Sequence, residues 1–189
     1  MIQLLAVYPG LFVFDASWQY WMYTENTISE HHPVLHTVLL GYIVDTIHQY
    51  TGAINHGAAI YTIFQIIMSI ACISYLITFV YGKLKRIWSL VLMLFFFGLY
   101  PPIVLQVLSA TKDTFFFAFI LLLITLTIEL VEDSEAFSYK PIKIILWILS
   151  TVFVIILRNN CIYAIPFFVI ALIKFTRKKR IFICRFYTC

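Results

Sequence analysis

The sequence predicts an all-α fold, a polytopic bundle of transmembrane helices with an extracytoplasmic first loop and a helix lying along the membrane interface. Composition is the first reason. Of the 189 residues, 62% are hydrophobic and 12% are charged, and the mean hydropathy is +0.95, whereas soluble domains are nearer half apolar and a quarter charged. The second reason is that the apolar residues form long runs. The third is that the excess of basic residues, a net charge of +4, lies in short clusters between these runs.

The first element is an apolar segment, residues 1–14, which we expect to be the outer part of a first span. It is shorter than the roughly 20 residues that a crossing helix needs. It also lacks the basic start of a signal peptide. Because the chain also ends soon after a basic cluster at 177–180, we expect the sequence to be a fragment of a longer protein.

A polar stretch from Asp15 to His36 follows, in a chain that is otherwise mostly apolar. Residues 34–50 then show apolar side chains at helical spacing, with polar and ionisable groups off that stripe. This pattern favours a helix along the interface over a crossing helix. Glycine and asparagine over 51–57 predict a turn after it.

Further apolar runs are of spanning or nearly spanning length. They are residues 58–81, 87–100, 114–130, 142–157 and 161–175. Pro101 and Pro102 should bend or stop a helix, because each removes a backbone donor, while Pro141 suits the first turn of the helix that it starts. We expect residues 1–180 to form one transmembrane domain and 181–189 to form a tail.

The basic clusters predict the orientation of the chain in the plasma membrane. If each run from residue 58 onward crosses once, the clusters at 83–86 and 177–180 fall on the same side, which the positive-inside rule makes cytoplasmic. The polar turns then share the extracytoplasmic side. A charge in mid-span costs roughly 2.5 to 3.5 kcal/mol on the insertion scale, so such groups gather where water or a substrate meets them. We therefore expect a multi-pass protein whose site faces outward.

Two interpretations of Asp15 stay open. It is either a solvated residue beside an interfacial belt of aromatic side chains or a general base at the mouth of a lipid-accessible cavity. A partly desolvated carboxylate suits the second role because it can take a proton from an acceptor hydroxyl.

The histidines His31, His32 and His36 are candidates for substrate binding. His32 and His36 are one helical turn apart, as two metal ligands would be. No acidic ligand stands at a comparable spacing, so the pattern favours the hydrated start of a helix over a metal site. The sequence predicts no cofactor, no disulfide or zinc framework among its four cysteines, and no nucleic-acid partner.

The other polar turns carry Lys112-Asp113 and Arg158-Asn159-Asn160. Asp113 would be favourable at the start of a helix, and Lys112 and Asp113 could simply form an interfacial ion pair. Alternatively, Lys112 and Arg158 hold an anionic group, and the guanidinium fork suits phosphate oxygens. The candidate site residues are thus Asp15, His31, His32, His36, Lys112, Asp113, Arg158, Asn159 and Asn160.

In this order, the features resemble the GT-C superfamily of polytopic membrane glycosyltransferases, which includes the protein mannosyltransferase and aminoarabinose transferase groups. A bacterial branch of uncharacterised members shows the same motifs. The resemblance is carried by Asp15, His31-His32-Pro33-Val34-Leu35-His36-Thr37, Tyr100-Pro101-Pro102, Lys112-Asp113-Thr114 and Arg158-Asn159-Asn160.

The resemblance implies a truncated GT-C-like fold and a function in the cell envelope. A sugar would pass from a polyprenyl-phosphate donor, which enters from the membrane lipid, to an acceptor on the extracytoplasmic side. Asp15 would correspond to the catalytic acidic residue, and Lys112 and Arg158 would contact the donor phosphate. The alternative is a transporter or flippase for a lipid-linked or anionic solute.

Overall fold

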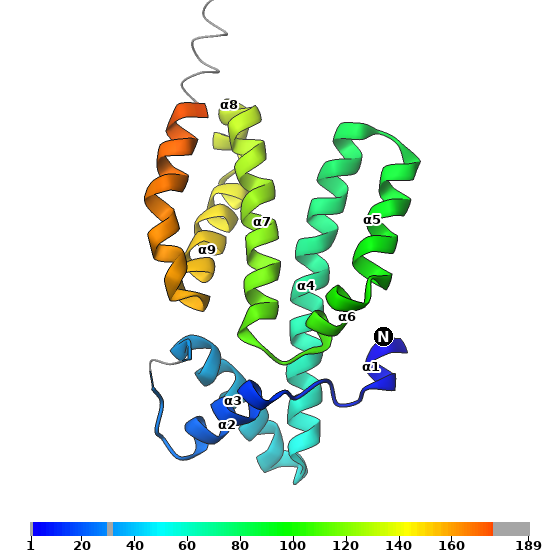
Figure 1. Ribbon diagram of the computed structural model, residues 1–189, viewed down its shortest axis with the longest axis vertical. Coiled ribbons are helices and arrows are strands. Elements are labelled where there is room, and N and C mark those ends of the chain that lie inside the picture. Colours follow the sequence, from blue (N-terminus) through cyan, green and yellow to red (C-terminus); the bar gives the residue numbers. More distant parts are fainter. Residues whose placement is uncertain (1, 30–31, 176–189) are drawn as a thin grey trace, which may run out of the picture.

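The computed structural model describes residues 2–29 and 32–175, and most of these residues are helical (Figure 1). Within the described ranges, β pairing is limited to an isolated parallel bridge between Leu11 and Ser109. The prediction of an all-α fold is therefore confirmed. The helices are α1 (Ile2–Ala6), α2 (Phe14–Thr24), α3 (Val34–Thr51), α4 (Ile54–Leu84), α5 (Ile87–Leu99), α6 (Pro101–Leu108), α7 (Lys112–Glu132), α8 (Ser134–Ser138), α9 (Pro141–Leu157) and the 3₁₀ helix η1 (Asn159–Ala164), which continues as a helix over 165–175.

Two of these helices, α4 and α7, are long and apolar enough to cross a membrane. The pair α5 and α6 would make a third span, but its two parts bend by 55°. The bend falls at Pro101 and Pro102, where the missing amide hydrogens predict a break. α9 and the helical stretch Asn159–Phe175 are apolar but shorter. Two or three helices could thus span a membrane by length and composition.

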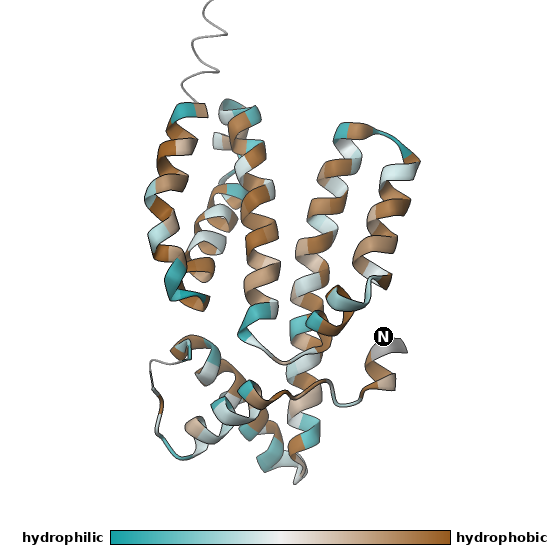
Figure 2. Ribbon diagram, viewed as in Figure 1, coloured by the Kyte–Doolittle hydropathy of each residue, from teal (hydrophilic) through white to brown (hydrophobic). Residues whose placement is uncertain are grey.

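The helices are hydrophobic along much of their length (Figure 2), and many of their large apolar side chains are exposed. No side chain of α5 is buried, although this helix is almost entirely hydrophobic. Trp88 and Leu92, for example, remain 77% and 71% exposed. Such a surface is unfavourable in water because large contiguous apolar patches are rare on soluble monomers, whereas lipid would accommodate it.

The turns divide between two ends of the structure (Figure 1). The α4–α5 turn and α8 lie at one end, which we call the α8 end. The α6–α7 turn and the α9–η1 turn lie toward the other, where α2 and α3 pack, and we call this the α3 end. Helices that run back and forth between two sides are expected to place successive turns at opposite ends in this way. Which end faces the outside of a membrane stays a prediction.

Close helix packing holds the α3 end together. A Cβ atom on Gly41 of α3 would lie 2.1 Å from Cγ of Tyr23 in α2. A Cβ atom on Gly57 of α4 would lie 2.5 Å from the backbone oxygen of Val44 in α3. Both glycines therefore let neighbouring elements approach more closely than any other residue would.

The turn predicted over 51–57 is shorter than expected. Only Gly52, with a left-handed φ of 72°, and the next residue separate α3 from α4. Residues 54–57 are already helical, so α4 begins before residue 58. Gly57 lies inside α4, and its missing side chain lets α4 pack closely against Val44 of α3. Its presence therefore does not mark a turn. α3 itself matches the helix predicted over 34–50, and its position along a membrane interface stays a prediction.

The other predicted segments have mixed outcomes. Residues 1–14 were expected to be part of a span. Among the described residues of this segment, the backbone leaves the helical conformation after α1 ends at Ala6 and becomes helical again at Phe14, where α2 begins. Pro141 begins α9 as predicted. His31, the basic cluster at 177–180 and the tail at 181–189 lie outside the described residues.

Candidate functional site

A buried hydrogen-bond network at the α3 end is centred on Gln19 of α2. Its side-chain oxygen lies 2.6 Å from Nδ1 of His36 and accepts a hydrogen bond from the Thr37 hydroxyl at 3.2 Å. Its side-chain nitrogen lies 3.4 Å from Nδ1 of His32. Gln19 and Thr37 have no exposed surface, so this amide joins α2 to the beginning of α3 from inside the protein.

The network fixes the proton positions on His36. The Gln19 oxygen can only accept, so Nδ1 of His36 is the donor. The other ring nitrogen, Nε2, then accepts from the Tyr61 hydroxyl at 2.7 Å. A neutral imidazole provides one donor and one acceptor, as this arrangement requires.

The surroundings of His36 also favour its neutral form. Burial lowers the pKa of His36 from 6.5 to about 4, and the positive charges of Lys112 and His32 add to this effect, while the backbone of Thr111, which would accept a hydrogen bond from the protonated ring, opposes it. The ring packs edge-on against Tyr61 and Phe115, with centroid separations of 6.0 and 6.1 Å. His36 is thus a neutral connector between α3, α4 and the start of α7.

A second polar group lies where α7 begins and α9 ends. Nη2 of Arg158 lies 3.4 Å from Oδ1 of Asp113, and the guanidinium carbon lies 5.1 Å from the centre of the Phe116 ring. Both charged side chains are about half exposed. A pair of this kind contributes only about 0–1 kcal/mol, so a stronger anionic partner could displace Asp113 from Arg158. The exchange would leave the buried Oδ1 atom of Asp113 without a partner among the described residues.

The backbone fastens the segment before Asp15 to the turn before Lys112. The amide of Leu11 donates to the carbonyl of Leu108 at 2.9 Å, and the amide of Ala110 donates to the carbonyl of Leu11 at 3.0 Å. Asp15 and Lys112 therefore each follow this bridge by only a few residues.

The core brings the third polar turn to the same place. Ala16 is completely buried in a cluster that also contains Ala110 and Leu157. Each of these residues lies within two positions of a polar turn. Ala16 follows Asp15, Ala110 is two residues before Lys112, and Leu157 precedes Arg158. Asp15 itself is exposed at the first turn of α2.

A cavity of about 500 Å³ opens beside these groups, between the start of α3 and the α9–η1 turn. Its polar wall includes His32, Asn159, Asn160 and Tyr163, and its apolar wall includes Leu35 and other aliphatic side chains. A pocket with one polar and one apolar wall suits an amphipathic ligand. The cavity lies at the end of apolar helices.

The structure thus groups most of the predicted site residues but gives them different roles. His32, Asn159 and Asn160 line the cavity, and Asp113 and Arg158 pair beside it. Asp15 and Lys112 are neighbours of this region but are absent from the cavity wall. His36, predicted as a substrate ligand, is only 1% exposed and has both ring nitrogens hydrogen-bonded, so the geometry supports a positioning role.

Gln19 and Tyr61 are residues of the site that the sequence did not single out. Gln19 lies among interfacial aromatic residues, and Tyr61 lies in a spanning run, so neither stands out by type. A signal for Gln19 was available, because it follows Asp15 by one helical turn and shares its side of α2. In the part of the chain that the structure describes, no group of three or more His, Cys, Asp or Glu side chains could hold a metal ion.

Comparison with known proteins places the chain in a family without assigning an activity. No curated protein and no solved structure matches the sequence. A family described as a family of unknown function, DUF6020, matches residues 16–186. This match covers the polar turns at Lys112 and Arg158, the cavity lining and nearly all of the helices, and it begins one residue after Asp15. The chain therefore belongs to the DUF6020 family.

Proposed function

We propose that this chain is a membrane glycosyltransferase, or the part of one that carries its site, and that it uses a sugar linked to polyprenyl phosphate. The observation that carries the proposal is that the segments bearing Asp15, Lys112 and Arg158 meet at one backbone bridge and in one core cluster at the α3 end. These residues come from distant parts of the sequence. Together they offer a base and two cations beside an amphipathic cavity.

The proposed reaction assigns one task to each group. Asp15 takes the proton from an acceptor hydroxyl as its oxygen bonds to the anomeric carbon of the sugar. The bond between that carbon and the phosphate oxygen breaks, and polyprenyl phosphate leaves with the bonding electrons. Lys112 and Arg158 stabilise the negative charge on the leaving phosphate, and Arg158 exchanges its weak pair with Asp113 for this partner.

The cavity walls would separate the parts of the donor. Asn159 and Asn160 offer hydrogen bonds to sugar hydroxyls, because amide groups can both donate and accept, while His32 lines the same cavity and is held by Gln19. The aliphatic wall, which includes Leu35 and Ile156, would accept the first isoprene units. A lipid-linked donor would then reach the site sideways from the membrane.

Transfer from a panel of polyprenyl-phosphate hexoses, measured with the protein in lipid nanodiscs, tests the proposal. Asp15→Asn should lower the rate at least about 100-fold, the lower range for loss of a general base. Asp45→Asn is the matched control, because Asp45 is a carboxylate of α3 that accepts a hydrogen bond from Gln49 on the surface. Equal rates in the wild type and Asp15→Asn would remove Asp15 from the mechanism.

A transporter or flippase is the second candidate, and one observation favours it. The side-chain oxygens of Gln65 and Ser69 are buried in α4 without a hydrogen-bond partner among the described residues, and polar residues inside a spanning helix are candidates for a substrate pathway. Movement of the lipid-linked sugar across liposomes without release of polyprenyl phosphate would support this function over transfer.

A further inference from the structure

A second cavity lies at the α8 end, away from the proposed transfer site. Its volume is about 650 Å³, and it is an open pocket lined by the last turns of α4 and α7, by α8 and by the start of α9. Three lysines and three carboxylates lie among its lining residues. They are Lys83, Lys140, Lys143, Glu129, Glu132 and Asp133.

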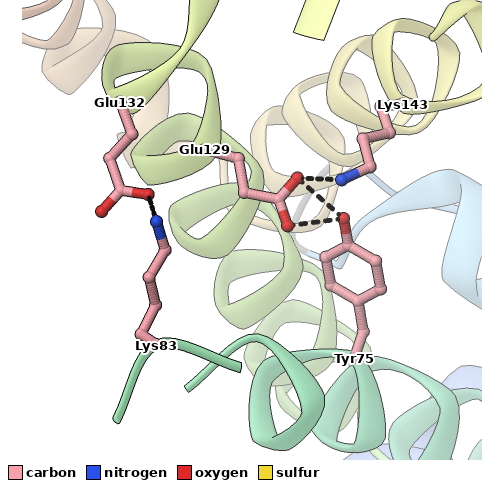
Figure 3. Close-up of polar contacts among 5 residues, drawn as sticks. All are labelled: Tyr75, Lys83, Glu129, Glu132 and Lys143. Atoms are coloured by element: carbon pink, nitrogen blue, oxygen red, sulfur yellow. Dashed lines mark hydrogen bonds and ion pairs between the residues drawn. The ribbon is translucent and has the colours of Figure 1, made fainter. Parts of the chain in front are cut away.

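Tyr75, Glu129 and Lys143 form a fixed polar part of the cavity lining, and Figure 3 shows their contacts. Glu129 forms an ion pair with Lys143 and accepts hydrogen bonds from the Tyr75 hydroxyl at 3.0 and 3.1 Å. The Glu129 and Lys143 side chains are only 16% and 27% exposed. Breaking this group would leave buried charges without partners, so it should stay intact when a ligand binds.

Another part of the lining is easier to open. Lys83 and Glu132 also form an ion pair, drawn apart from the first in Figure 3, but their side chains are 52% and 41% exposed. Exposed pairs contribute little to stability. A ligand that supplies one positive and one negative group can therefore replace this pair with two new ones.

The remaining charges complete the match to such a ligand. Among the described residues, Lys140 has no ion pair, and one Asp133 oxygen caps α8 through the amide of Ala136 at 2.9 Å. The three lysines and three carboxylates of the lining sum to no net charge. A ligand with only a positive or only a negative group would therefore pair with side chains of one sign and leave those of the other sign without a ligand partner. A zwitterion would place its anion near Lys83 and Lys140 and its ammonium near Glu132 and Asp133.

The position and the walls of the cavity narrow the class of zwitterion. The cavity lies at the ends of α4 and α7, the two helices that are long enough to span a membrane, and so at the expected level of lipid headgroups. Phe79 and Phe137 provide an apolar part of its wall, against which a glycerol backbone could pack. A free amino acid would leave that wall uncovered.

We propose that this cavity binds a zwitterionic phosphoryl-ammonium group, carried as the phosphoethanolamine headgroup of a membrane phospholipid. The site is independent of the proposed sugar transfer, because its residues lie at the opposite end of the helices. It would fix a lipid between α4 and α7 beside the exposed Lys83–Glu132 pair that joins these helices.

Calorimetric titration of the detergent-solubilised protein with short-chain phosphatidylethanolamine tests this proposal, with phosphatidylglycerol of the same chain length as the anionic comparison. The wild type should bind the zwitterionic lipid about tenfold more tightly, the factor expected from one hydrogen bond to a charged group. Equal affinity for the two lipids would overturn the proposal.

Two variants and one control separate recognition from folding. Glu132→Gln should weaken phosphatidylethanolamine binding about tenfold without weakening phosphatidylglycerol binding, whereas Lys140→Gln should weaken both. Lys85→Gln is the control, because this lysine lies at the same end of α4 but outside the cavity wall. Each variant should retain the thermal midpoint of the wild type, which shows that it still folds. If Glu132→Gln still preferred phosphatidylethanolamine over phosphatidylglycerol by the wild-type factor, the proposed role of Glu132 in binding the ammonium group would be contradicted.

A further titration with free phosphoethanolamine distinguishes the two sources of the same group. Weaker binding than that of the lipid supports a membrane ligand, since the apolar wall then contributes. Binding as tight as that of the lipid would contradict the role of a phospholipid.

Discussion

The Tyr61 hydroxyl and Nε2 of His36 lie 2.7 Å apart and join the buried face of α4 to α3. This contact continues through the His36 ring to Gln19 in α2. Three helices that carry or adjoin the candidate site are thus connected by side chains that do not reach solvent. The site's geometry depends on this connection, and the first two predictions concern it.

Gln19→Leu should destabilise the protein by about 2–4 kcal/mol, because it leaves the buried donors of His36 and Thr37 without their acceptor. The shape of the side chain changes little, so lost hydrogen bonding is the main cause. Thermal denaturation in detergent measures the effect. Gln49→Leu, on the exposed face of α3, should change stability by no more than about 0.5 kcal/mol, and an equal loss in both variants would contradict the role of the network.

Stability should also depend on pH through His36. Its pKa is about 4 in the folded protein, against 6.5 for an ordinary histidine, so the unfolded state binds the proton more readily. The stability contributed by neutral His36 is complete above pH 6.5. It is lost as the pH falls from 6.5 to about 4, at roughly 1.4 kcal/mol per pH unit within this window.

Thermal midpoints measured between pH 7 and 4 check this dependence against His36→Leu. The variant has a lower midpoint at pH 7, but its midpoint should fall less steeply with pH than that of the wild type. His56→Gln, which changes an exposed histidine, should keep the steep dependence. Parallel curves for the wild type and His36→Leu would show that another group is responsible.

The close approach of α3 and α4 predicts a difference between two glycines of the same helix. In Gly57→Ala the added methyl group meets backbone atoms of Val44 at 2.5 and 2.7 Å, so the helices must separate, at an expected cost of about 1–3 kcal/mol. In Gly82→Ala nothing lies within 4 Å of the new Cβ, and higher helix propensity should stabilise α4 by up to about 1 kcal/mol. Thermal midpoints of the two variants provide the comparison, and equal shifts would contradict the packing.

The sequence predicted the helices well because apolar runs and prolines act locally. The break at Pro101 and the start of α9 at Pro141 follow from the missing amide hydrogen alone. Gly57 was misinterpreted as part of a turn, because its close contact with Val44 comes from another helix. Such a contact has no local signature.

The candidate site was predicted only in part for the same reason. The charged turns stand out in an apolar chain, and the structure pairs Asp113 with Arg158 and lines a cavity with His32 and Asn159. The burial of His36 depends on Gln19 and Tyr61, which arrive from α2 and α4. Residue type and spacing could not distinguish a buried connector from a ligand in that case.

The central claim is that the segments carrying Asp15, Lys112 and Arg158 meet at one extracytoplasmic end. Labelling of single cysteines with a membrane-impermeant maleimide in intact cells, after replacement of the native cysteines, tests it most directly. Ser17→Cys, Lys112→Cys and Asn160→Cys should all be labelled from outside, whereas Ser134→Cys, in α8, should be labelled only after the membrane is permeabilised. The account would be contradicted if any of the first three required permeabilisation or if Ser134→Cys were labelled in intact cells.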